Sequence, residues 1–181
     1  MIKILLVEDN DVDARLTQDL LEEWGTEEFD IIHVTSMSDA VTRLARARFD
    51  AVLLDLSLPD GYGLSTVRQM QAANPTIAII VLSGLNDQTL ALQAVQNGAQ
   101  DYLVKGPGQS ELLARSIRYA IERKRAEERL TYLAQYDQLT GLVNRTLFRD
   151  RLIQAMARSK RLQQPLGLML LDLDHFKPVN D

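Results

Sequence analysis

Asp50-Ala51-Val52-Leu53-Leu54-Asp55-Leu56-Ser57-Leu58-Pro59-Asp60-Gly61 is the stretch that decides the fold. Its apolar run is stopped by an acid and then by Pro and Gly, which is typical of a buried strand that ends in a loop. A carboxylate at the end of such a strand is costly unless it has a partner or a metal. We therefore expect a strand over 50–55 and a polar site around Asp55.

Three other apolar runs also end in polar groups. We predict strands over 2–7, 77–82 and 101–104, because each run is short and apolar. In an open parallel α/β sheet, ligands bind at the carboxyl ends of the strands. The groups expected to converge at this edge are Glu8, Asp9, Asp55, Ser83 and Lys105.

Strand patterns alternate with helical patterns over the first 120 residues or so. This alternation predicts an α/β fold in which a five-stranded parallel sheet carries helices on both faces. The remaining strand, second in chain order, is expected over 29–35. The expected helices are about 11–24, 38–48, 63–73 and 87–97, with Ser36 or Ser38 capping the second and Gly25 ending the first.

The composition restricts the protein's class. The chain of 181 residues suits one full domain and something smaller, and it has no cysteine, which excludes disulfides and thiolate metal sites. No apolar stretch approaches the roughly 20 residues that span a bilayer. The first apolar run is too short for a signal peptide. We therefore expect a cytoplasmic protein without membrane contact.

A long charged helix is predicted to follow the fifth strand, from about 110 to 135, because no helix breaker occurs before Gly141. Its bases are mixed with acids, which is typical of a solvated helix face and gives no reason to expect DNA. A weak heptad row favours a connecting helix that dimerises, and a plain terminal helix is the alternative. The row consists of Tyr119, Arg123, Ala126, Leu130 and Leu133.

The last part of the chain predicts a helix over 146–162 and a strand over 166–173. A lone apolar strand needs a sheet on which to be buried. We therefore interpret 137–181 as the opening of a further domain.

Three carboxylates at one sheet edge would raise one another's pKa, and a divalent cation would relieve that repulsion. Hard oxygen ligands suit Mg²⁺. We expect Asp9, Asp55 and the backbone carbonyl of Ser57 as ligands, with Glu8 holding a metal-bound water. A carboxylate can also attack phosphorus to give an aspartyl phosphate, whose charge Lys105 would stabilise.

Residues 1 to about 122 resemble the receiver domain of two-component response regulators. The resemblance rests on four motifs in order: Leu6-Val7-Glu8-Asp9-Asn10, Leu54-Asp55-Leu56-Ser57-Leu58-Pro59-Asp60-Gly61, Val81-Leu82-Ser83-Gly84 and Gly98-Ala99-Gln100-Asp101-Tyr102-Leu103-Val104-Lys105. It implies a flavodoxin-like, doubly wound (βα)5 fold. It also implies Mg²⁺ as cofactor and a sensor histidine kinase or phosphotransfer protein as partner.

The same resemblance assigns roles to single residues. Asp55 is the phospho-acceptor, and Glu8 and Asp9 form the acidic pair. Ser83 is the switch hydroxyl, Tyr102 the switch aromatic, and Lys105 the phosphate contact. The chain departs from the family in one place, because Gly106 stands between Lys105 and Pro107, where the family has a cis-proline directly after the lysine.

The second half resembles the start of the diguanylate cyclase (GGDEF) domain, through Tyr136-Asp137-Gln138-Leu139-Thr140-Gly141-Leu142-Val143-Asn144-Arg145 and Leu171-Asp172-Leu173-Asp174-His175-Phe176-Lys177-Pro178-Val179-Asn180-Asp181. The resemblance implies a metal ligand at Asp172 and a guanine contact at Asn180. The signature that names the family does not occur by Asp181. This chain is therefore not expected to be a competent cyclase, and GTP is expected only in an intact, longer protein.

The leading hypothesis is a phosphorylation-controlled receiver (1–122) that acts through a helical linker (123–136) on a cyclase domain beginning at 137–181. The alternative is a receiver whose output is only dimerisation or partner docking, through the helices at 87–97 and 110–135. A phosphatase with an aspartate nucleophile is disfavoured, because that class has a second Asp two residues after the nucleophile, where this chain has Ser57.

Overall fold

The computed structural model describes residues 1–23, 29–84 and 88–171. The chain divides into two compact units, Met1–Arg129 and Leu130–Asp181. Trp24, Gly25, Asp172, His175 and Asn180 lie outside the described residues.

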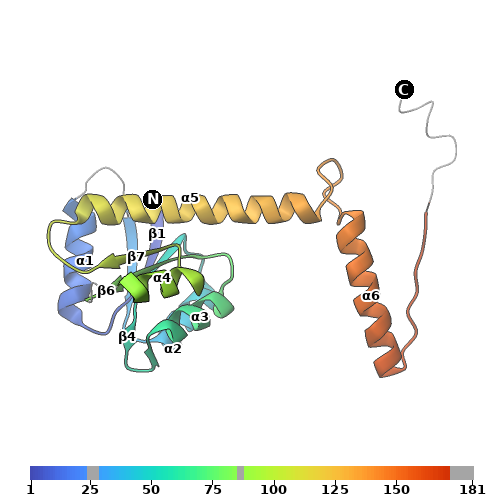
Figure 1. Ribbon diagram of the computed structural model, residues 1–181, viewed down its shortest axis with the longest axis horizontal. Helices are drawn as coiled ribbons and strands as arrows, with labels where there is room; N and C mark the ends of the chain where they lie inside the picture. The colour runs from blue at the N-terminus through green and yellow to red at the C-terminus, as the bar shows by residue number, and fades with distance from the viewer. Residues whose placement is uncertain (24–28, 85–87, 172–181) are drawn as a thin grey trace. The chain divides into compact units, whose positions relative to one another are not determined.

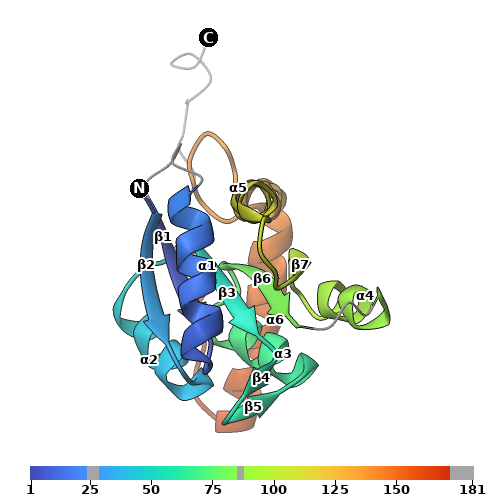
Figure 2. The same ribbon diagram turned by 90° about the vertical axis from the view of Figure 1, so that its left-hand side faces the viewer.

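The first unit, drawn in blue to yellow in Figure 1, contains a five-stranded parallel sheet in the order β2-β1-β3-β6-β7, whose strands are labelled in Figure 2. The strands are β1 (Ile2–Val7), β2 (Phe29–Val34), β3 (Ala51–Asp55), β6 (Ala78–Ser83) and β7 (Asp101–Val104). The predicted flavodoxin-like fold is confirmed, and each predicted strand of this sheet is present within a residue or two of its expected ends.

Helices cover both faces of the sheet, as Figure 2 shows. One face packs against α1 (Asp11–Glu23) and the first half of α5 (Ser110–Gln135). The other packs against α2 (Met37–Arg46), α3 (Leu64–Ala73) and α4 (Gln88–Gln96). Strands β3 and β6 are buried at every residue, because central parallel strands have helices on both sides.

A short antiparallel hairpin of β4 (Ser57–Leu58) and β5 (Gly61–Tyr62) follows β3, and the sequence patterns did not predict it. Asp60 at its turn accepts hydrogen bonds from the backbone N–H groups of Met37 (2.8 Å) and Ser38 (2.9 Å). The hairpin therefore supplies a carboxylate to the start of α2, where free N–H groups and the helix dipole favour negative charge. Ser36 is the N-cap of that helix.

The helix α5 is packed on the sheet only along its first three turns. Its buried residues follow helical spacing and end at Ile121; they are Leu113, Ala114, Ser116, Ile117, Ala120 and Ile121. Ser116 Oγ donates a hydrogen bond of 2.5 Å to Asp101 Oδ2 on β7, which ties the helix to the edge strand. Beyond Ile121 the apolar side chains Leu130 and Leu133 are exposed.

The second unit contains the end of α5, a turn and α6 (Arg145–Leu162), and none of its described residues is buried. Asn144 joins the two helices. Its Nδ2 donates to Ala134 O (2.7 Å), and its Oδ1 accepts from Leu147 N (3.0 Å) as the N-cap of α6.

The predicted strand over 166–173 is wrong for its described part. Residues 166–171 form no strand, since no second strand lies alongside them in the described residues to pair with their backbone. None of the described helices is long and apolar enough to cross a membrane.

Candidate functional site

Three carboxylates meet at the carboxyl edge of the sheet. Glu8 and Asp9 follow β1 directly, and Asp55 is the last residue of the neighbouring strand β3. One oxygen from each lies within 4.8 Å of the others. Glu8 and Asp55 are buried, with 1% and 5% of their surface exposed, whereas Asp9 is open to solvent.

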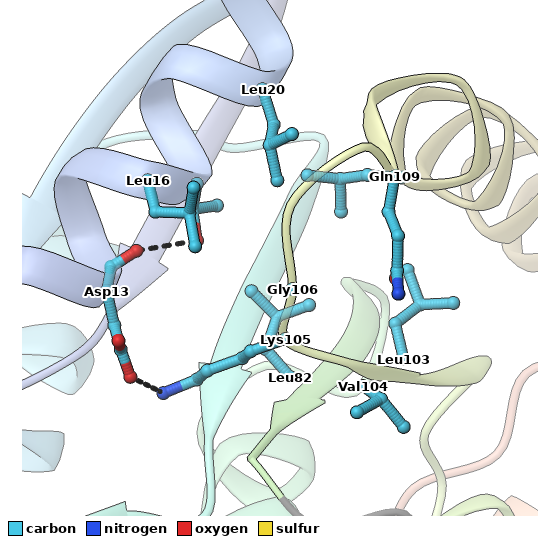
Figure 3. Close-up of a pocket in the computed structure, with 11 residues that line it drawn as sticks. Asp13, Leu16, Leu20, Leu82, Leu103, Val104, Lys105, Gly106 and Gln109 are labelled. Carbon is cyan, nitrogen blue, oxygen red and sulfur yellow. Dashed lines mark hydrogen bonds and ion pairs between the residues drawn. The ribbon is translucent and has the colours of Figure 1, made fainter.

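Lys105 brings a positive charge into this group. Its Nζ lies 2.5 Å from Glu8 Oε2 and 3.2 Å from Asp55 Oδ1. A third contact, 2.9 Å long, reaches Asp13 Oδ2 on α1 (Figure 3). The backbone places the lysine, because Lys105 N donates to Ser83 O (2.8 Å) and so extends the β6–β7 pairing by one bond.

Sequence reasoning missed Asp13. Its only signal is an acidic residue in the first turn of the helix that follows the Glu8-Asp9 pair, and that position is usually explained by the helix dipole. The contact becomes visible only when α1 is packed beside the loop after β7.

The surroundings of Glu8 and Lys105 shift both their pKa values upward. Burial raises the pKa of Glu8, the charge of Asp55 adds to the rise, and Lys105 opposes it. Burial by itself would lower the pKa of Lys105. The hydrogen bonds to Glu8 and Asp13 and the charge of Asp55 outweigh burial, so the pKa is raised and the lysine stays protonated.

Backbone donors hold the carboxylates in place. Asp55 Oδ2 accepts from Ser57 N (3.1 Å), and Glu8 Oε1 accepts from Asn10 N (3.3 Å). His33 Nε2 on β2 donates to the backbone carbonyl of Glu8 (2.7 Å) and so fixes the main chain just after β1.

Ser83 lies at the end of the strand next to β3, and Tyr102 lies one strand further from Asp55. Ser83 ends β6 and is buried, and Tyr102 is half-buried on β7, paired in register with Val81. The loop after Lys105 departs from the family, and no cis peptide bond occurs in it or elsewhere in the described residues.

The donor set fits Mg²⁺. Carboxylate oxygens are the ligands that this hard cation prefers, and a cluster of three with one exposed member leaves room for its waters. Asp9, Asp55 and Ser57 would hold the ion, and it would neutralise part of the carboxylate charge that Lys105 faces among the described residues.

This edge has a buried Asp at the end of a central strand, two acids directly after the neighbouring strand and a lysine directly after the edge strand. The response regulator receiver domain model matches residues 4–117, so the chain belongs to that family. The diguanylate cyclase GGDEF domain model matches residues 134–181, and residues 118–133 lie between the two matches.

Several relatives contain the same domain. The transcriptional regulatory protein ZraR of Salmonella typhimurium is 32% identical over 104 residues, which are 58% of this chain and 23% of ZraR. The DNA-binding transcriptional activator DevR/DosR of Mycobacterium tuberculosis is 33% identical over 119 residues, 65% of this chain and 54% of the relative. The chain thus spans about a quarter and about half of these proteins.

Among solved structures, a response regulator receiver domain protein from Clostridium thermocellum superposes with a TM-score of 0.60 at 27% identity. The match covers 70% of this chain and 98% of that one.

Proposed function

We propose that Asp55 accepts a phosphoryl group from the phosphohistidine of a sensor kinase or phosphotransfer protein. The observation that carries this proposal is the 3.2 Å contact between Lys105 Nζ and Asp55 Oδ1 beside two further carboxylates. A carboxylate oxygen of Asp55 forms the new bond to phosphorus as the bond from phosphorus to the donor's imidazole nitrogen breaks. The imidazole leaves with the electron pair of that bond.

Charge is the main obstacle to this transfer, because an anionic phosphoryl group approaches an acidic edge. Lys105 stabilises the phosphoryl oxygens by donating to them, and Ser83 offers a hydroxyl from the neighbouring strand. Asp9, Asp55 and Ser57 would hold Mg²⁺, with Glu8 on a metal-bound water, and the ion would supply the remaining positive charge.

The proposed output is a change at the outer surface of α4 and α5. A phosphate on Asp55 adds roughly −1.5 to −2 charge, which draws Ser83 toward it and lets Tyr102 turn into the space released. Large apolar side chains are already exposed on these helices: Leu92, Val95, Leu112 and Tyr119. We propose that they and the linker 123–136 form a homodimer interface.

The segment matched by the GGDEF model makes cyclic di-GMP synthesis the proposed output of the intact protein. The receiver (1–122) and linker would control a cyclase domain that begins at 137–181 and binds GTP, with Asp172 on metal and Asn180 on guanine. A cytoplasmic location is part of the same proposal, because GTP is there. The alternative output is dimerisation or docking alone.

The test of the phosphoryl transfer is intact-mass analysis after incubation with a small phosphodonor, with and without Mg²⁺. We expect a single phosphoryl addition that needs Mg²⁺ and is absent from Asp55→Asn. Equal modification of Asp55→Asn would overturn the proposal. Asp50→Asn is the matched control, because Asp50 lies at the opposite end of the same strand.

A further inference from the structure

Asp13 is the one carboxylate on Lys105 that comes from a helix. Its Oδ2 lies 2.9 Å from Lys105 Nζ, across 92 positions of the sequence. It does not belong to the cluster of Glu8, Asp9 and Asp55 whose oxygens could share a cation. Its effect on the site must therefore pass through the lysine.

The backbone of Asp13 is held in the first turn of α1. Asp13 N donates to Asn10 Oδ1 (3.4 Å), and Asp13 O accepts from Thr17 Oγ1 (2.9 Å). The carboxylate therefore cannot follow the lysine by a shift of the helix end. If Lys105 moves toward a new partner, its contact with Asp13 lengthens.

Three carboxylates share the ammonium group of Lys105. One of its N–H donors makes a hydrogen bond to Asp13 Oδ2, and Glu8 Oε2 and Asp55 Oδ1 lie within ion-pair distance. A phosphoryl oxygen on Asp55 would therefore compete for this ammonium group with the carboxylate of Asp13.

The exposed fraction of each side chain decides which carboxylate loses its contact with Lys105. The side chain of Glu8 is 1% exposed, so removing its cation would leave a buried charge without a partner. The side chain of Asp13 is 36% exposed, so water can replace the lysine there at little cost. The contact with Asp13 is the one to be released.

Lys105 also has room to move. Its stem lines a cavity of about 20 Å³, shown in Figure 3, which is enough for about one water molecule. The cavity is mostly apolar, and its lining includes Leu16, Leu20, Leu82, Leu103 and Leu113. The stem can therefore shift without displacing tightly packed side chains.

We propose that Asp13 is a positioning residue that holds Lys105 on the helix side of the site and competes with the phosphoryl group for it. The inference rests on the proposed phosphoryl transfer to Asp55. It adds that the carboxylate of Asp13 and the phosphoryl group compete for Lys105. Removal of the Asp13 charge should free one donor of Lys105, and the site should then bind a phosphoryl group more tightly.

The test is a titration with beryllofluoride, a phosphoryl mimic, at saturating Mg²⁺, followed by fluorine NMR. Asp13→Asn keeps the side-chain shape and removes the charge. We expect about two- to fivefold tighter binding than in the unmutated protein, the effect of losing one partly exposed ion pair. Asp13→Glu restores the charge and should return the affinity toward the unmutated value.

Asp11→Asn is the matched control, because Asp11 also lies in the first turn of α1 and no ion pair joins it to Lys105 in the described residues. Its affinity should not change. Equal affinities of Asp13→Asn and the unmutated protein would overturn the inference while the proposed function stands. An equal gain in Asp11→Asn would also overturn it. Mimic bound equally by Asp55→Asn would instead overturn the proposed function, and the inference with it.

Discussion

Replacement of Lys105 by methionine should destabilise the receiver and strengthen its binding of Mg²⁺. Methionine keeps most of the volume of the lysine stem but has no charge. The ammonium nitrogen lies 2.5, 2.9 and 3.2 Å from carboxylate oxygens of Glu8, Asp13 and Asp55, and the lysine side chain is only 12% exposed. Without it, three carboxylates face one another at a buried edge with no cation between them.

The magnitude follows from the burial of the partners. Removal of one member of a buried ion pair costs about 3–5 kcal/mol, because the remaining charge is left without a partner. The side chain of Glu8 is buried, so this cost applies to its pair with Lys105. The side chain of Asp13 is partly exposed, so loss of its pair with Lys105 adds little to the loss of stability. We expect a loss of about 3 kcal/mol in the free energy of unfolding when Mg²⁺ is absent, and a smaller loss when Mg²⁺ supplies the missing charge.

The assay is urea denaturation with chelator and with excess Mg²⁺, together with calorimetric measurement of the Mg²⁺ affinity. Lys3→Met is the control, because Lys3 Nζ lies 3.8 Å from Asp30 and its side chain is 37% exposed. Such a surface pair contributes at most about 1 kcal/mol. If Lys105→Met and Lys3→Met lose equal stability and Mg²⁺ restores neither, the view of Lys105 as the balancing cation is refuted.

Four further predictions concern other parts of the chain. Ser116→Ala should cost about 1.5–3 kcal/mol in urea denaturation, because Asp101 loses a hydrogen bond that holds α5 on β7; an unchanged midpoint would contradict this. Asp60→Asn should cost about 0.3–1 kcal/mol at neutral pH, because it removes a negative charge from the start of α2. The backbone N–H groups there lower the pKa of Asp60, so its contribution to stability is present above the unfolded pKa and lost as pH falls through the folded pKa; a pH-independent difference in stability between the two proteins would argue against this charge effect. Hydrogen exchange should be faster in 130–171 than in the sheet, because none of those residues is buried, and uniform protection in a demonstrated monomer would refute it. Sedimentation velocity should show more dimer with beryllofluoride and Mg²⁺, and less of this gain in Ser83→Ala; no gain with the mimic bound would reject dimerisation as the output.

Much of the fold could be predicted from local patterns. The run from Ala51 to Leu54, stopped by Asp55 and then by Pro and Gly, identifies a central strand, because only a strand covered on both faces is continuously apolar. Alternation with helical patterns implies parallel strands, whose carboxyl ends share one edge. The meeting of Glu8, Asp9, Asp55 and Lys105 follows from that geometry without any tertiary information.

Partners across elements could not be predicted in this way. Asp60 contacts the start of α2, and Asp13 contacts Lys105, only because helices and loops are packed together. The hydrophobic periodicity of one segment does not indicate which other segments pack against it. The strand expected over 166–173 shows the same limit, since an apolar run becomes a strand only where a second strand pairs with it. The sequence by itself therefore determined the strands of the parallel sheet, the helices around it and the groups that stand at the strand ends. The tertiary structure decided how Lys105 is shared among the carboxylates of Glu8, Asp13 and Asp55, because contacts between these side chains depend on distances that only packing sets.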